Sequence, residues 1–370
     1  GVIGSAAFRH RQGGRVDQPV PGRGGDERRV RADIGEMREP GPEGPAQVHR
    51  DEGPVGEIGG VAVLGREDGR IARGGPIPIN ASGGLMGIGH PVGATGVRMA
   101  LDAQGARPID AIAVLGSRAL GMGARFYQPL AQALQAAGLN VALLEQRGHG
   151  DSPWRPSHRC DWGFREPLVN EIPVALDWVK SRSSGLPVYL MGHSLGGHYS
   201  AMAAGVYGGQ VDGIILAACG SPWLGGFTGA TRSKLKFLCA MIPPASALLG
   251  YYPGDKLGFG GRAARTLMQD WLALANTNRY QANGFSDDLD CGIAQYSGPV
   301  LSLRMADDAF APPASVEAVV EKFITATVSN VVLDEQALGH RADHFRWVRA
   351  PAATVQQVVR WHEKQQSGKR

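Results

Sequence analysis

The stretch that decides the fold is "YLMGHSLGGHYS", residues 189–200. It contains Gly192-His193-Ser194-Leu195-Gly196, which fits the pattern Gly-x-Ser-x-Gly. The apolar run "PVYLMG" (187–192) leads into this pattern, and the helix-competent segment "GGHYSAMAAG" follows it. Such a context predicts a sharp strand-to-helix turn that projects a serine hydroxyl, with glycines where side chains would collide. Ser194 is therefore a candidate nucleophile, and the alternative is a glycine-rich turn with a structural role only.

On both sides of this stretch, apolar runs alternate with helical patterns. The segment "RFYQPLAQALQAAG" (125–138) predicts an amphipathic helix that ends at Gly138. The alternation is typical of a parallel sheet with helices between the strands, so we predict an α/β fold with a doubly wound, mostly parallel sheet. The runs that we interpret as strands are residues 110–116, 187–192, 211–219, 299–308 and 329–335, together with 140–152, which is a strand that continues into a glycine-rich turn.

A serine hydroxyl needs a base to remove its proton and a carboxylate to orient that base. In this architecture both should follow later strands, in the order Ser, Asp, His. Asp307 and Asp308 end one strand run, and we prefer Asp308, because Asp307 fits a solvated turn or a helix cap equally well. His340 and His344 both follow the last strand, and the residues alone do not distinguish them.

Acyl transfer also needs two backbone N–H groups that bind the developing oxyanion. We expect one from Leu195, directly after the candidate nucleophile. For the second we choose Leu120, in the loop "SRALGMGARFY" (117–127) after the first strand of the series. The alternative is that these residues only turn the chain.

At these residues the chain, from 110 to about 349, resembles the α/β-hydrolase fold. More closely, it is similar to bacterial serine hydrolases related to monoacylglycerol lipases and serine aminopeptidases. The resemblance implies that His344 rather than His340 is the base, and that residues 222–296 are a cap inserted into a core formed by 107–221 and 297–370. Two positions depart from the pattern: Glu145 stands where aspartate is frequent, and "DHFRW" (343–347) stands where Gly-His-Phe is usual. The segments that carry the resemblance are "ARFYQPLAQALQAAGLNVALLEQRGHGDS", "YLMGHSLGG", "LLGYYPGDKLGFGG", "QDWLALANTNRY", "ADDAFAPP" and "DHFRWVR".

The composition changes near position 107, and Phe8 is the only aromatic residue before it. Residues 1–75 mix Gly, Pro, Arg and Glu without apolar periodicity, so we expect them to be disordered. Within residues 76–106, "NASGGLMGIGHPVGATGVRM" resembles the C-terminal signature of thiolases, with His90 at their active-site histidine. Thiolase chemistry requires an acylatable cysteine upstream, and no cysteine precedes Cys160. We therefore expect His90 to be inactive.

Composition limits the partners. The net charge of +4 on 370 residues comes without a basic stripe, so no nucleic-acid partner is expected. Four scattered cysteines predict neither a zinc site nor a disulfide scaffold but reduced thiols in a cytoplasmic protein. No apolar run reaches the length of a membrane span. The acidic segment "DDLDC" (287–291) matches no metal-site spacing and is interpreted as a solvated loop.

We therefore predict a carboxylesterase or lipase-like serine hydrolase that acts on small or medium acyl esters through Ser194, His344 and Asp308, without a cofactor or metal. The alternatives are a peptidase, thioesterase or acyltransferase on the same fold, and an inactive hybrid that carries a thiolase remnant. The sequence leaves the exact substrate and the oligomeric state open.

Overall fold

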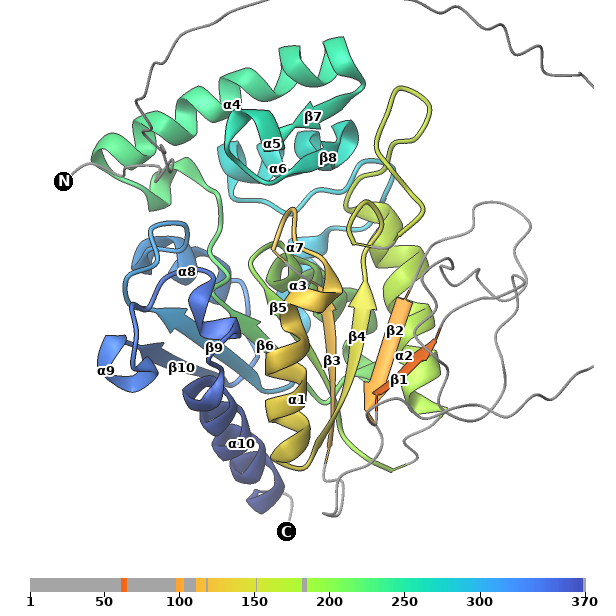
Figure 1. Cartoon of the computed structure of the whole chain (residues 1–370), viewed down its shortest axis with the longest axis vertical. Helices are drawn as coiled ribbons and strands as arrows, with labels where there is room; N and C mark the ends of the chain where they lie inside the picture. Colours follow the sequence, from red (N-terminus) through yellow and green to blue (C-terminus); the bar gives the residue numbers. More distant parts are fainter. Residues whose placement is uncertain are drawn as a thin grey trace, which may run out of the picture. The chain divides into compact units, whose positions relative to one another are not determined.

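The computed structural model describes residues 61–64, 98–102, 111–117, 119–150, 152–181 and 185–368. Most of the segment expected to be disordered, and His90 with most of the thiolase-like fragment, lie outside these residues. The described strands form an eight-stranded sheet in the order β1-β2-β4-β3-β5-β6-β9-β10, and two further strands form a separate ribbon (Figure 1).

Six strands of the large sheet run parallel, which confirms the predicted fold class. β4, β5 and β6 are buried along their whole length, as expected for strands covered on both faces. Each of the six strands begins within two residues of the start of a predicted run, whereas β4 and β9 end before the runs 140–152 and 299–308 do. The parallel strands are β3 (Ala111–Ser117), β4 (Leu139–Glu145), β5 (Val188–His193), β6 (Gly213–Ala217), β9 (Val300–Met305) and β10 (Val328–Leu333).

Two antiparallel strands complete one edge of the sheet, and they were not among the predicted strand runs. β2 (Arg98–Asp102) pairs with β4, and β1 (Val61–Leu64) pairs with β2. β1 belongs to the segment expected to be disordered, and β2 belongs to the thiolase-like fragment. The pairing with β2 satisfies backbone groups of β4 that an open edge would expose. A chain that began near Ala106 would lack this cover.

Helices cover both faces of the sheet, as a doubly wound fold requires (Figure 1). α1 (Gln128–Ala136) and α10 (Ala352–Ser367) pack on one face, where Trp347 is fully buried. α2 (Ile172–Lys180) and α3 (Leu195–Tyr207) pack on the other. The remaining elements of the core are the turns Ala124–Tyr127, Pro167–Glu171, Gly208–Gln210 and Arg346–Val348, with α8 (Pro313–Val320) and α9 (Glu335–Leu338).

Between β6 and β9 the chain leaves the sheet, and we call residues 222–296 of this excursion the cap segment. Its longest helix is α4, which packs on α6 and β7. α7 lies within the cap segment but packs against α3, where Gly205 and Gly292 allow close backbone contact. The elements of the segment are the turn Leu224–Gly226, α4 (Gly229–Leu249), β7 (Tyr251–Pro253), α5 (Gly254–Leu257), β8 (Arg262–Ala264), α6 (Arg265–Thr277) and α7 (Leu289–Gln295).

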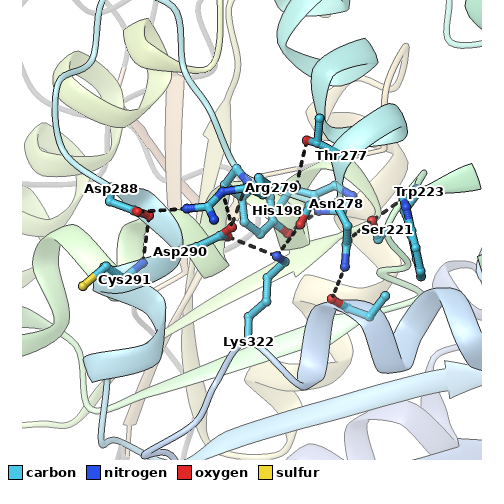
Figure 2. Close-up of polar contacts among 12 residues, drawn as sticks. His198, Ser221, Trp223, Thr277, Asn278, Arg279, Asp288, Asp290, Cys291 and Lys322 are labelled. Atoms are coloured by element: carbon cyan, nitrogen blue, oxygen red, sulfur yellow. Dashed lines mark hydrogen bonds and ion pairs between the residues drawn. The ribbon is translucent and has the colours of Figure 1, made fainter. Parts of the chain in front are cut away.

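A polar network ties the cap segment to the core at both of its ends (Figure 2). Ser221, just before the segment, donates through Oγ to Asn278 Oδ1 at 2.8 Å. Asn278, with φ of 55°, ends α6, and its carbonyl accepts from Lys322 of the core. Lys322 also pairs with Asp290 at 3.1 Å.

The acidic segment 287–291 belongs to this network and is not the solvated loop that we expected. Asp288 caps α7 by accepting from Cys291 N at 3.0 Å, and it pairs with Arg279 at 2.9 Å. Asp290 faces Lys322. These carboxylates therefore start a helix and hold the end of the cap segment in place.

Candidate active site

Ser194 occupies the turn between β5 and α3, as the sequence predicts. Its backbone has φ 55° and ψ −119°, a conformation that side-chain-bearing residues rarely adopt. Two glycines make the turn possible: a Cβ on Gly192 would overlap the carbonyl of Gly196, and one on Gly197 would overlap the side chain of Cys219. The Ser194 amide donates to Ala217 O at 3.1 Å, which fastens the turn to β6. The surrounding contacts therefore hold the backbone of Ser194 in a strained conformation. Backbone strain that is maintained by such contacts is typical of functional positions.

Asp308 and His344 lie in contact, although 36 residues separate them in the chain. Their closest atoms, Asp308 Oδ2 and His344 Nδ1, are 2.7 Å apart, and both residues are buried. The other oxygen of Asp308 accepts from the amides of Phe310 (2.8 Å) and Ala311 (3.1 Å). The carboxylate is thus fixed in orientation with one oxygen directed at the imidazole, which suits an acid that orients a base.

The alternative residues, Asp307 and His340, have other contacts. Asp307 is exposed, and its carboxylate accepts from Ala342 N at 3.1 Å while its amide donates to Ala342 O at 2.9 Å. His340 lies with Nδ1 at 3.0 Å from Arg341 O. Asp307 therefore fastens the loop between β10 and α10 against the end of β9.

The imidazole of His344 lies beside the serine turn. Its ring centroid is 4.8 Å from that of His193, the residue before Ser194. Burial, with a smaller contribution from nearby His344, holds the pKa of His193 well below its usual range. His193 is therefore neutral at pH 7, so it leaves His344 without a cationic neighbour at this point.

Leu195 and Leu120 are the residues from which we expect the two N–H donors. α3 begins at Leu195, so this amide is in the first turn, where N–H groups have no acceptor within the helix. In the loop 119–124, the amide of Ala119 donates to Tyr127 Oη at 3.0 Å, and that of Met122 donates to Ala119 O at 3.1 Å. Tyr127 Oη also lies 2.8 Å from His193 Nδ1, which connects the loop with the serine turn.

Two side chains, one at the end of β4 and one in the turn after it, hold this loop. Sequence reasoning noted Glu145 only as a departure from the family pattern and missed the role of His149. His149 Nε2 accepts from Gly121 N at 2.9 Å, while its Nδ1 lies 3.0 Å from Arg147 O. This arrangement requires a neutral imidazole with its proton on Nδ1. Glu145 accepts from Ala124 N at 3.3 Å. We interpreted "RGHGDS" only as turn glycines, but two polar residues at and just past the end of a parallel strand, at the sheet edge that carries Ser194, are a signal that could have identified them.

We expect His149→Ala to lower kcat of ester hydrolysis tenfold or more, with little change in KM. The loop that contains Leu120, the second donor that we predict, would lose an anchor, and an oxyanion contact would act mainly in the transition state. His149→Gln should retain most of the rate, because its Oε1 can replace Nε2 as the acceptor. The measurement is steady-state kinetics on both variants, with thermal unfolding as a check of folding. Equal losses in the two variants would show that His149 has only a structural role.

Aromatic side chains surround the imidazole of His344. The rings of Phe345 and Phe310 lie 4.8 and 5.2 Å from it, and these residues are 38% and 53% exposed. Phe259 of the cap segment lies 6.5 Å from Phe310 and 5.3 Å from Trp271. The side chain of Leu120 lies against Gly260, next to Phe259. The surroundings of His344 are thus apolar on the side that faces the cap segment.

Comparison with known proteins supports this assignment of the fold. Residues 111–245 match the family described as serine aminopeptidase, S33. The lysophosphatidylserine lipase ABHD12 of Macaca fascicularis is 37% identical over 186 residues, which cover 50% of this chain and 37% of that protein. Protein ABHD12B of Homo sapiens is 36% identical over 92 residues, 24% of each chain. The chain thus spans less than half the length of the curated relatives that it matches.

Solved structures resemble the chain over most of its length. The structure of DcsB in complex with its substrate analogue covers 73% of this chain and 95% of its own, with a TM-score of 0.50 and 16% identity. The match to the monoacylglycerol lipase of Paleococcus ferrophilus covers 72% of this chain and 98% of that chain, with a TM-score of 0.45 and 19% identity. At these identities the likeness to DcsB shows the fold alone.

The expectation of a cytoplasmic protein is contradicted by this comparison, because the ABHD12 relatives are membrane-associated lipases. Scattered cysteines and the lack of a long apolar run were the grounds for that expectation, and neither identifies a compartment. In the part of the chain that the structure describes, no helix has the length and apolar character needed to cross a bilayer. The sheet order and the resemblance to DcsB together show that the chain has the α/β-hydrolase fold, and part of it matches the serine aminopeptidase family model.

Proposed function

We propose that the chain is a serine hydrolase that cleaves carboxylic esters by a double displacement. Ser194 Oγ attacks the carbonyl carbon while His344 removes its proton, and the amides of Leu195 and Leu120 bind the oxyanion. His344 then gives the proton to the leaving alcohol, which leaves an acyl group on Ser194. Water, activated by His344, attacks this acyl-enzyme and releases the acid. Asp308 keeps the proton of His344 on Nδ1, so that Nε2 is free to act as the base.

The observation that carries this proposal is the contact between His344 and Asp308 beside a strained serine turn. Asp308 Oδ2 lies 2.7 Å from His344 Nδ1, and the His344 ring is 4.8 Å from the ring that precedes Ser194. Ser194, Asp308 and His344 follow three parallel strands, either directly or in the loop after the strand. Carboxyl ends of parallel strands gather at one edge of a sheet, where such sites form.

The aromatic surroundings of His344 favour an apolar acyl or alcohol group in the substrate. Phe310 and Phe345 are partly exposed beside the imidazole, and Phe259 approaches from the cap segment. Apolar walls with few polar groups are typical of sites for small apolar ligands. We also propose that residues 222–296 act as the cap, on a core formed by 107–221 and 297–370.

A second candidate is an aminopeptidase, because the matched family bears that description. A thioesterase or acyltransferase would use the same residues with a different leaving group or acceptor. The reaction types differ in what leaves the tetrahedral intermediate: an alcohol departs more readily than an amine, which must be protonated first. Substrate comparison therefore separates them.

The experiment is a panel of p-nitrophenyl esters from acetate to decanoate beside aminoacyl p-nitroanilides, with fluorophosphonate labelling of the same preparation. We expect labelling and ester hydrolysis, with kcat/KM that rises with acyl length because Phe310 and Phe345 bind the chain. Amide hydrolysis above ester hydrolysis would favour the aminopeptidase. Absence of labelling in a folded preparation would overturn the proposal and favour an inactive hybrid.

A further inference from the structure

Helix α4, the longest helix of the cap segment, leaves large apolar side chains exposed. Phe237 is 70% exposed and Leu248 is 78% exposed. The value for Leu248 is the largest among the described large apolar side chains. The opposite face of α4 carries Cys239, Ile242 and Ser246, which are buried. Figure 1 shows α4 at the outer edge of the cap segment, with α6 and β7 packed against it. The exposed side chains are thus not required for the packing of the cap segment.

The exposed apolar residues follow one helix face. Phe237, Met241, Pro244 and Leu248 are spaced i, i+4, i+7 and i+11, the spacing of a single stripe. Phe237, Pro244 and Leu248 are exposed, and Met241 is partly exposed. The protein therefore has a continuous apolar stripe along the outer side of α4. Such patches on a surface mark interaction sites more often than isolated apolar residues do.

All charged residues of α4 are basic. Arg232, Lys234 and Lys236 lie in its first eight residues, they are exposed, and the helix contains no Asp or Glu. The three cations lie within five residues of one another, so they repel each other. An anionic partner would relieve this repulsion. The charge pattern thus indicates that the partner of α4 is negatively charged.

We propose that the outer face of α4 docks onto the surface of a bilayer that contains anionic lipids. An apolar stripe flanked by Lys and Arg is the pattern of helices that lie in the membrane interface, with the apolar side chains inserted and the cations on the headgroups. A second copy of the chain fits less well, because α4 contains no Asp or Glu that could neutralise the three cations of the other copy. This inference concerns the surface of the cap segment and is independent of the reaction proposed for Ser194.

The test is cosedimentation of the full chain with vesicles of phosphatidylcholine, with and without phosphatidylglycerol. We expect binding to the anionic vesicles that weakens as salt is raised, because headgroup attraction is screened. Phe237→Glu combined with Leu248→Glu should weaken binding at least tenfold, since two inserted apolar side chains are lost and two anions are added. Lys234→Gln combined with Lys236→Gln should weaken binding to anionic vesicles about tenfold and leave binding to phosphatidylcholine unchanged.

Ile324→Glu is the matched control, because Ile324 is 76% exposed but lies in the turn between α8 and β10. It should bind vesicles as the parent chain does. All variants should hydrolyse a water-soluble short ester at the parent rate, which shows that they are folded. The proposal is overturned if Ile324→Glu weakens binding as much as the α4 variants, or if the parent chain does not bind anionic vesicles. It is also overturned if the α4 variants change only self-association in sedimentation velocity experiments.

Discussion

Replacement of Ser194 by alanine should abolish ester hydrolysis and fluorophosphonate labelling together. The proposed reaction has one activated oxygen, and without it neither an acyl-enzyme nor a phosphonyl adduct can form. The residual rate should fall about 10⁴-fold or more below that of the parent chain, the scale of losing a member of such a triad. The measurement is labelling detected by mass spectrometry, with kinetics on a p-nitrophenyl ester.

The control is Ser200→Ala, which alters a buried serine further along α3 and should leave labelling intact. Labelling of Ser194→Ala at another residue would show that the nucleophile lies elsewhere. A second variant, Ser194→Gly, tests the backbone rather than the chemistry. Glycine tolerates φ 55° and ψ −119° without the clash of a Cβ. We therefore expect Ser194→Gly to be inactive but more stable than Ser194→Ala, by about 1 kcal/mol in urea unfolding.

The parallel part of the fold was predictable because each of its strands is a continuous apolar run between helical patterns. The serine turn was predictable because Gly-x-Ser-x-Gly follows an apolar run, and a Cβ on Gly192 would overlap the carbonyl of Gly196. Both features depend on residues that are close in the sequence. The same local information placed α1 and its end at Gly138, which has φ of 94°.

The edge strands β1 and β2 were not predictable in this way. β2 is "RMALD", which includes Arg98 and Asp102 and has no distinct period-two pattern. It forms a strand because it pairs with β4, about 40 residues later, whose edge would otherwise be unpaired. The local sequence of β2 does not contain this long-range cause. His149 was missed for a related reason: its contact with Gly121 spans 28 residues, and the sequence around it gave only turn glycines.

The two aspartates and two histidines after β9 and β10 should separate clearly in a mutational test. His344→Ala should lower kcat by about 10⁴-fold, the scale of losing a triad member, whereas His340→Ala should have little effect. The reason is position: His344 is buried against Asp308 and next to His193, while His340 contacts the backbone of Arg341. Kinetics on one soluble ester, with thermal unfolding of each variant, provide the measurement.

The carboxylates give the sharper comparison, because Asp→Asn preserves size at both positions. In Asp308→Asn, one amide oxygen can still accept from Phe310 and Ala311, so the NH₂ group is turned toward His344 Nδ1. Two donors cannot face each other, and the imidazole must move its proton to Nε2, where it can no longer act as a base. We expect a loss of about 10⁴-fold in kcat. Asp307→Asn keeps an oxygen for Ala342 N and should change the rate less than about threefold, since this contact is a single surface hydrogen bond. Similar losses at both positions would mean that Asp308 supports the loop rather than the base.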